Sequence, residues 1–425
     1  MSRGKKAVMA DQPTPQPDSR GDYRALLHRR EFALFFVATS VATLGTSMVP
    51  VALTFALLSS GYSVTTVGAV FAAETLPAVV LLLVGGIVGD RWPRRLVMTG
   101  ADILRCTSQG LLAALLATGH PAALVLMGLG ACVGIGNAFY KPAEDGLVPQ
   151  AAGSDKIKQA NNLISIVASL ASVLGPSIAG LLVSLGGAAL AIGLDAASYA
   201  VSAACLVLMR VAMQEAAAPA SVITDLRQGW SEFSRYRWLQ LITAQFGLLN
   251  LFAFAPFFVL GPVLFASVPG GARLWGFVAS ASGIGGALGG LLILRSRPSR
   301  PLVVVELAFA LLATPLLLLS FRAPVVLVAL GSGMFGASLA VINILFSTAI
   351  QESVPASFLS RVSSFVSVVA LGLTPVGFAL CGPAEHFLGA RPALGAGAAL
   401  LLLSAVVAVA SRDIRMFKSQ PVAPT

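Results

Sequence analysis

Charged side chains are scarce in this chain of 425 residues. Asp, Glu, Lys and Arg together make up 11% of it, whereas 56% of its residues are hydrophobic. A soluble domain carries about 25% charged residues. A chain this long with so few charges cannot cover its surface with polar groups, so lipid must be its main solvent. The shortage of charge therefore excludes an ordinary soluble protein.

Histidine and cysteine are also rare. The three histidines lie outside the apolar runs or at their edges, which makes histidine a poor candidate for carrying protons through a membrane. The cysteines lack CxxC spacing, so we expect neither structural disulfides nor a thiolate metal site; they are Cys106, Cys132, Cys205 and Cys381. No Walker-type Gly-Lys-Ser/Thr and no catalytic-triad spacing is found. We therefore expect no metal, no cofactor and no enzymatic activity.

Long apolar runs are what the chain has in abundance, and a helix needs about 20 apolar residues to cross a membrane. These runs predict twelve spans, over 32–59, 64–88, 96–117, 121–140, 161–184, 187–209, 239–266, 273–294, 301–320, 324–349, 362–382 and 389–410. The fold expected is thus an all-α polytopic membrane protein with two pseudo-symmetric six-helix halves, 31–209 and 239–411. A central link covers 210–238, and 1–30 and 412–425 are tails, the first of them disordered.

The net charge of +10 is a topology signal and gives no support to nucleic-acid binding. All Lys and Arg residues lie in the tails or in loops that join an even-numbered span to an odd-numbered one, except Arg105, Arg273, Arg322 and Arg391. Positive loops stay in the cytoplasm, so we expect both termini and the central link to be cytoplasmic and the protein to lie in the cell (inner) membrane. Residues 1–30 contain no apolar core of a signal peptide, so no cleavage is expected.

A weak internal repeat relates the two halves. Gly86-x-x-x-Asp90-Arg91 has a counterpart in Gly290-x-x-x-x-Arg295, and Val148-Pro149 has one in Val354-Pro355. Strings this short also match by chance, so the repeat indicates a duplication without establishing it. Two six-helix halves around a midplane binding site is an arrangement found in secondary transporters.

The turn after the second span carries the resemblance to a known family. Gly86-x-x-x-Asp90-Arg91-x-x-Arg94-Arg95 resembles the signature of the major facilitator superfamily, with Pro93 in place of the usual glycine. The segment 171–180 in span five is similar to the antiporter motif of that superfamily: it keeps Gly175, Pro176 and Gly180 and has alanine at two glycine positions. The resemblance implies a transporter with twelve helices that works by alternating access.

Further strings resemble the exporter branch that includes macrolide efflux pumps and enterobactin-type siderophore exporters. They are 138–143 (Ala-Phe-Tyr-Lys-Pro-Ala), 147–149, 159–163, 194–199 and 351–364. The resemblance implies proton-coupled export of a small, partly apolar molecule such as an antibiotic, secondary metabolite or siderophore. The alternative is uptake or facilitated movement of a nutrient or lysophospholipid on the same fold. The expected partners are this small-molecule substrate, protons and membrane lipid, and we expect a monomer.

The resemblance also implies a conformational latch at the charged turn. Its expected members are Gly86, Asp90, Arg91, Arg94, Arg95, Asp102 and Arg105. A carboxylate at the end of span two could cap a neighbouring helix and pair with an arginine across an interface. Two simpler interpretations stay open: the turn arginines are topology anchors, and Asp102 with Arg105, three residues apart in span three, is a structural ion pair.

Three carboxylates lie inside expected spans and are candidates for proton coupling. Charges there are costly and commonly mark proton relays or substrate contacts. Glu74 lies near the middle of span two with no basic residue in its helix, although it could instead bond backbone groups freed by Pro77. For Asp195 in span six, a structural role and a functional role both stay open. Glu306 in span nine is within two turns of Arg300, with which it could pair.

The substrate cavity of this superfamily is lined by helices one, four, seven and ten. Polar residues in the corresponding spans are the candidates for substrate contact: Thr46, Asn137, Asn250 and Asn343. An amide inside a bundle more often bonds a neighbouring helix. The phenylalanines of span seven (Phe252, Phe254, Phe257 and Phe258) could form an aromatic wall or simply face lipid. The GxxxG pairs Gly130/Gly134 and Gly286/Gly290 predict close helix packing.

Overall fold

The computed structural model describes residues 19–81, 92–210, 229–296, 298–355 and 358–417, and every regular element it assigns there is a helix. The first half contains α1 (Ser19–His28), α2 (Arg30–Ser59), α3 (Val64–Val80), α5 (Arg94–Thr118), α6 (Ala123–Ala152), α7 (Ile157–Gly186) and α8 (Ala188–Leu208). The second contains α10 (Arg237–Leu249), the π-helix η1 (Asn250–Phe254), α11 (Ala255–Ala266), α12 (Gly271–Arg295), α13 (Pro301–Leu311), α14 (Thr314–Ser320), α15 (Val325–Ser353), α16 (Leu359–Gly372), α17 (Thr374–Leu388), α18 (Ala390–Ala410) and α19 (Arg412–Met416).

These helices confirm the predicted all-α polytopic class. Within the described ranges, 10 helical segments are long and apolar enough to cross a membrane. The helix α3 falls short because it has 17 residues, and α5 is more polar since it carries Asp102 and Arg105. The count of twelve spans therefore stays a prediction. Most of the tail 1–30, most of the link 210–238 and the end of span two lie outside the described residues.

Local sequence features mark the start or the end of several helices. The Ser63 side chain accepts a hydrogen bond from the backbone N–H of Thr66 (3.2 Å) and so caps the start of α3. Gly187 and Gly389 have φ angles of 84° and 86°, which favour glycine. The first makes the turn between α7 and α8, and the second makes the turn between α17 and α18. The last two helices of each half are therefore joined by the same kind of turn, as a duplication predicts.

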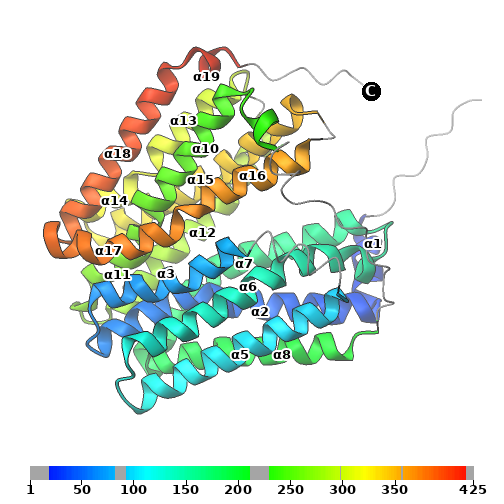
Figure 1. The fold of residues 1–425 in the computed structure, drawn as a ribbon, viewed down its shortest axis with the longest axis vertical. Helices are drawn as coiled ribbons and strands as arrows, with labels where there is room; N and C mark the ends of the chain where they lie inside the picture. Colours follow the sequence, from blue (N-terminus) through cyan, green and yellow to red (C-terminus); the bar gives the residue numbers. More distant parts are fainter. Residues whose placement is uncertain (1–18, 82–91, 211–228, 297, 356–357, 418–425) are drawn as a thin grey trace, which may run out of the picture.

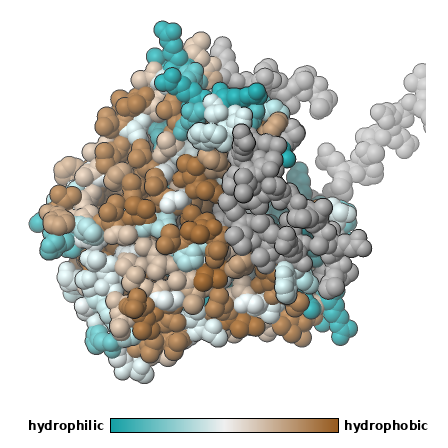
Figure 2. All heavy atoms as spheres, viewed as in Figure 1, coloured by the Kyte–Doolittle hydropathy of each residue, from teal (hydrophilic) through white to brown (hydrophobic). Residues whose placement is uncertain are grey.

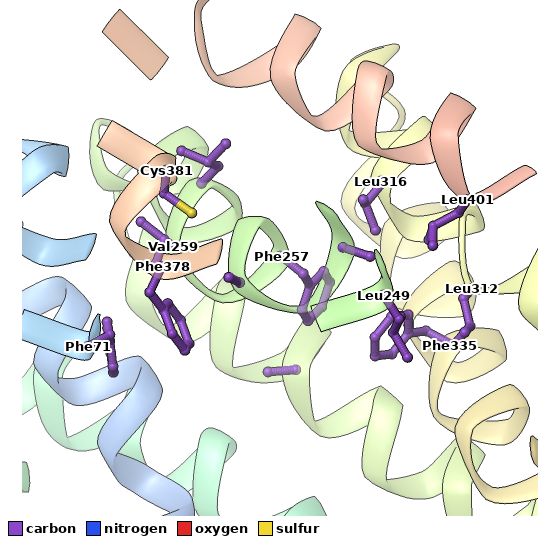
Figure 3. Packing of buried hydrophobic residues seen from close by; sticks show 14 of the residues in the cluster. Phe71, Leu249, Phe257, Val259, Leu312, Leu316, Phe335, Phe378, Cys381 and Leu401 are labelled. Atoms are coloured by element: carbon purple, nitrogen blue, oxygen red, sulfur yellow. The ribbon is translucent and has the colours of Figure 1, made fainter. Parts of the chain in front are cut away.

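The two halves lie side by side and diverge toward one side of the bundle (Figure 1). We call the side that carries α1 and α19 the tail side, and the opposite side, with the turns 60–63 and 267–270, the short-turn side. The main contacts between the halves pair α7 with α12 and α3 with α17. They lie toward the short-turn ends of these helices: Phe71 stacks on Phe378 with ring centroids 5.1 Å apart (Figure 3).

Buried hydrophobic residues follow the same division. One cluster crosses between the halves and includes Val67 and Phe71 of α3 together with Phe378 of α17. A second cluster, around Phe32 and Met98, belongs to the tail side of the first half alone. The halves thus share a core near the short-turn side and have separate cores near the tail side. Hydrophobic residues also cover much of the outer face in Figure 2, as a lipid-facing surface requires.

Glycine makes the contact between α7 and α12 possible. A Cβ on Gly276 would lie 2.5 Å from the carbonyl oxygen of Pro176 and 3.2 Å from Cα of Gly180. The GxxxG expectation is confirmed for Gly134, where a Cβ would lie 1.9 Å from the Glu74 carbonyl oxygen. For Gly286 and Gly290 it is wrong, because their Cβ positions meet neighbouring atoms at 3.5 and 3.8 Å, an ordinary contact distance. The glycines of α12 that approach α15 closely lie one residue before Gly286 and Gly290 in the sequence.

A single methyl group at Gly276 should therefore weaken the junction between the halves. We expect Gly276→Ala to lower the stability of this conformation by about 1–3 kcal/mol, the usual cost of overpacking. The thermal unfolding midpoint of the purified protein in detergent measures this effect. Gly290→Ala on the same helix is the matched control, since a Cβ there meets only Ile344 Cδ1 at 3.8 Å. Equal midpoints for the two variants would contradict the proposed tight junction.

Candidate functional site

The predicted latch is only partly visible. Gly86, Asp90 and Arg91 lie outside the described residues, so their role stays a prediction. Arg94 and Arg95, at the start of α5, donate hydrogen bonds to the carbonyl oxygens of Gly146 and Met209. Both carbonyls belong to the first half. These bonds join the tail-side ends of α6 and α8 to α5 within the first half, and the latch and the topology-anchor interpretations of the two arginines both stay open.

Asp102 and Arg105 form the expected ion pair on α5, and both side chains are buried, at 0% and 4% exposed. The second oxygen of Asp102 accepts a hydrogen bond from the Ser202 hydroxyl on α8 (2.6 Å). Arg105 also donates to the side-chain oxygen of Asn137 on α6 (3.1 Å). Asn137 therefore bonds a neighbouring helix, and the pair ties α5, α6 and α8 together. The structural alternative for this pair is thus well supported by its geometry.

Two tyrosines enclose the Arg105 guanidinium, which lies 4.0 Å from the ring centroid of Tyr140 and 4.3 Å from that of Tyr199. The Tyr199 hydroxyl forms a 2.9 Å hydrogen bond with the hydroxyl of Thr46 on α2. Thr46 is exposed, whereas Tyr199 is fully buried. Neither tyrosine was a predicted site residue. The available signal was their rarity, since the chain has only five tyrosines.

Asp195 lies beside this network on α8 and is 0% exposed. Among the described residues, neither carboxylate oxygen has a hydrogen bond of normal geometry, although the Gln109 side chain lies next to the carboxylate. The charges that act on it are the Arg105 guanidinium and the Glu74 carboxylate. On α2, a Cβ at Gly45 would lie 2.7 Å from Asp195 Oδ1, so the backbone of α2 passes directly over the carboxylate.

Three charged groups thus share a small buried volume in the first half. With both carboxylates ionised, Asp102, Asp195 and Arg105 carry one excess negative charge. An unpaired ionised carboxylate is expensive to bury, and neutralisation by a proton is the usual escape. Asp102 has two charge-stabilising partners, Arg105 and Ser202, whereas Asp195 has no hydrogen bond of normal geometry to a described residue. Asp195 is therefore the member of the cluster better suited to hold a proton.

The other two coupling candidates have different surroundings. Glu74 is half-buried on α3, where its backbone packs against Gly134 of α6. Glu306 is 1% exposed on α13 and accepts a 2.7 Å hydrogen bond from the side chain of Gln245 on α10. The pairing of Glu306 with Arg300 is therefore wrong in this conformation. Glu306 belongs to the second half and lies apart from the Arg105 cluster.

The two remaining asparagines also differ. Asn250 begins the π-helix η1 and donates to the carbonyl oxygens of Phe246 (2.9 Å) and Ala370 (3.2 Å), which links span seven to α16. Single-turn π-helices are rare and frequent at functional sites. Asn343 is exposed on α15 and bonds only its own helix, at the carbonyl oxygen of Leu339 (2.8 Å). Its amide oxygen is thus available to a solute.

The antiporter-like segment of α7 lies where three helices meet. A Cβ at Gly175 would lie 1.9 Å from Ser47 Oγ on α2, and one at Gly180 would lie 2.5 Å from the carbonyl oxygen of Ala272 on α12. The carbonyl of Pro176 faces Gly276 of α12. Small residues in this segment therefore let one face of α7 pack closely on α2 of its own half. They let another face pack closely on α12 of the other half.

The phenylalanines of span seven divide between core and pocket. Phe257 is fully buried and stacks on Phe335, with ring centroids 5.4 Å apart (Figure 3). The ring of Trp275 also lies next to Phe257, at 5.0 Å. Phe252 instead lines an apolar pocket of about 320 Å³ between η1, α11, α17 and α18. Both alternatives for these phenylalanines, an aromatic wall for a solute and contact with lipid, therefore stay open.

The arrangement of these helices is that of a polytopic membrane protein of the major facilitator type. Two solved structures show the likeness of fold. The nucleoside transporter NupG has a TM-score of 0.73 and 14% identity, covering 89% of this chain and 98% of its own. A bacterial homologue of the human lysosomal transporter Spinster has a TM-score of 0.69 and 14% identity, covering 96% and 100%.

The chain belongs to the family described as Transmembrane secretion effector, whose model matches residues 23–425. It is similar to a protein named multidrug efflux pump Tap of Mycolicibacterium fortuitum, with 26% identity over 393 residues, 90% of this chain and 95% of that protein. The same-named protein of Mycobacterium tuberculosis (strain ATCC 25618 / H37Rv) is 24% identical over 404 residues, 92% of this chain and 95% of its own. The family and these relatives are transporters rather than enzymes, and the resemblance drawn from the sequence is confirmed.

Proposed function

We propose that this protein exports small, partly apolar molecules, drugs among them, in exchange for protons by alternating access. The observation that carries the proposal is the carboxylate of Asp195, which is fully buried beside Arg105 and has no hydrogen bond of normal geometry to a described residue. It lies in a bundle whose halves share a core on one side only. The name of the relatives supports drug export, and the absence of a Walker motif favours an ion gradient as the source of energy.

The arrangement of the halves suggests which state of the transport cycle the structure represents. Lys and Arg residues concentrate in the tails and tail-side loops, which favours a cytoplasmic tail side. On that side, polar residues of α7 are exposed, namely Asn161, Asn162, Ser165 and Ser169. We infer a conformation open to the cytoplasm, in which a solute reaches Thr46 and Asn343, exposed on α2 and α15. Proton binding from the opposite side would then accompany release.

Transport of a fluorescent lipophilic cation, ethidium, tests the direction and the coupling. Inverted membrane vesicles that contain the protein should accumulate ethidium when their lumen is acidified, and a proton ionophore should abolish the accumulation. The same chain with Asp145→Asn, a carboxylate that is exposed on the tail side, is the control and should behave like the wild type. Ethidium that leaves the vesicles under an acid lumen would contradict export and favour uptake on the same fold.

A further inference from the structure

Tyr140 and Tyr199 contact the same guanidinium but differ in their hydroxyl groups. Both rings flank Arg105, from α6 and α8. The Tyr140 hydroxyl is buried near Ser202 without a hydrogen bond of normal geometry. The Tyr199 hydroxyl is bonded to Thr46, which lies on a different helix and is exposed. Of these two rings, only that of Tyr199 connects the buried cation to an exposed side chain.

The direction of this hydrogen bond follows from the number of protons available. The Thr46 hydroxyl donates its single hydrogen to the carbonyl oxygen of Ala42, one turn earlier on α2 (2.9 Å). Thr46 must therefore accept from Tyr199, whose O–H donates. The geometry of α2 enforces this contact, because the absence of a side chain at Gly45 lets the helix pass directly over Asp195 and the neighbouring Ser198. The bond thus joins α2 to the side of α8 that carries Asp195.

We infer that Tyr199 is a positioning residue that transmits the charge state of the Arg105 cluster to α2 through its hydrogen bond with Thr46. When the cluster gains or loses a proton, Arg105 shifts between Asp102 and Asp195, and the ring stacked on it moves with it. The hydroxyl of that ring then moves Thr46 and with it the wall of the binding region. This inference rests on the proposed proton coupling and adds the residues through which it acts.

The charged and titratable side chains that face this cluster come from four helices. Glu74 lies on α3, Asp102, Arg105 and Cys106 on α5, Tyr140 and Glu144 on α6, and Asp195 and Tyr199 on α8. Glu144 is already paired with Lys141 at 2.8 Å. These groups set the charge around Arg105, and the Tyr199 hydroxyl forms the direct hydrogen bond from the cluster to α2.

The test measures a pH response that needs no substrate. Spin labels at Ser154→Cys and Ser299→Cys, exposed in the tail-side loops α6–α7 and α12–α13, report the distance between the halves. The four native cysteines are replaced by alanine, and the full chain is studied in lipid nanodiscs by pulsed electron paramagnetic resonance. For the wild type we expect the ratio of open to closed populations to change between mildly acidic and mildly alkaline pH.

Tyr199→Phe should reduce that pH-dependent change in the ratio about fivefold, the factor that corresponds to one lost hydrogen bond. The ring and its contact with Arg105 remain, so the thermal unfolding midpoint should change little. Thr46→Val removes the same bond from the other side and should have the same effect, which covers the case of a poorly folding Tyr199 variant. Tyr140→Phe is the matched control and should keep the wild-type response.

Each outcome has a separate meaning. A pH response that is equal in Tyr199→Phe, Thr46→Val and the wild type overturns the inference while leaving proton coupling intact. A loss of similar size in Tyr140→Phe also overturns it, because ring packing would then be the cause. A wild type that ignores pH contradicts the proposed coupling itself, and the inference falls with it.

Discussion

Asp195→Asn should abolish proton-driven export and leave substrate exchange intact. An asparagine has the shape of a protonated aspartate but cannot release a proton, so the variant should stay in one protonation state. In proteoliposomes we expect ethidium movement driven by a pH gradient to fall to the level of protein-free vesicles. Exchange of ethidium across the membrane without a gradient should continue, since it requires no net proton transfer.

Asp195 is preferred over the other candidates because of its surroundings. Glu306 already accepts a hydrogen bond from Gln245, and Glu74 is half-buried. Asp195 combines full burial with the absence of any hydrogen bond of normal geometry and with Arg105 close by. A carboxylate in such a place changes charge readily when a cation moves toward it or away.

Glu306→Gln is the matched control for this prediction. It makes the same change of an acid to its amide, but at a buried carboxylate of the second half that already has a partner. We expect its gradient-driven transport to stay within about twofold of the wild type, a difference well below the loss of one hydrogen bond. The prediction is wrong if Asp195→Asn retains gradient-driven transport or if Glu306→Gln loses it equally.

The class of fold could be predicted from the sequence because lipid imposes strict limits on helix length and polarity. The expected span 32–59 matches α2 and 389–410 matches α18 within two residues. Breaks inside spans were not predictable: span seven contains a π-helix at 250–254, although nothing in Asn-Leu-Phe-Ala-Phe marks a local change of helix type. Such breaks depend on contacts with neighbouring helices, here between Asn250 and α16.

The candidate site was predictable where a charge lies inside an apolar run. Asp102, Arg105 and Asp195 stood out in this way, and the structure places them in one cluster. Their partners Tyr199 and Ser202 were not predicted, because the importance of these two side chains depends on which helix faces which. The separation of Glu306 from the cluster has the same origin, because helix order alone does not determine distance between the halves.

Arg105→Met should cost more stability than any substitution at an exposed ion pair. It leaves the Asp102 carboxylate buried without its cation, and breaking a buried pair in this way typically costs about 3–5 kcal/mol. At the exposed pair between Arg237 and Asp413, 4.0 Å apart, Arg237→Met should cost about 1 kcal/mol or less. Thermal unfolding midpoints of the purified proteins in one detergent compare the two.

The double variant Asp102→Leu with Arg105→Met separates the charge from the packing. Replacing both members of a buried pair by hydrophobic residues is often neutral for stability, so the double variant should recover most of the midpoint that Arg105→Met loses. It should nevertheless lack the pH response, because the Arg105 cation that shifts between Asp102 and Asp195 is then absent. A double variant that is as unstable as Arg105→Met would show that the methylenes and ring contacts of Arg105, and not its charge, stabilise the first half. A double variant that keeps the pH response would remove Arg105 from the coupling.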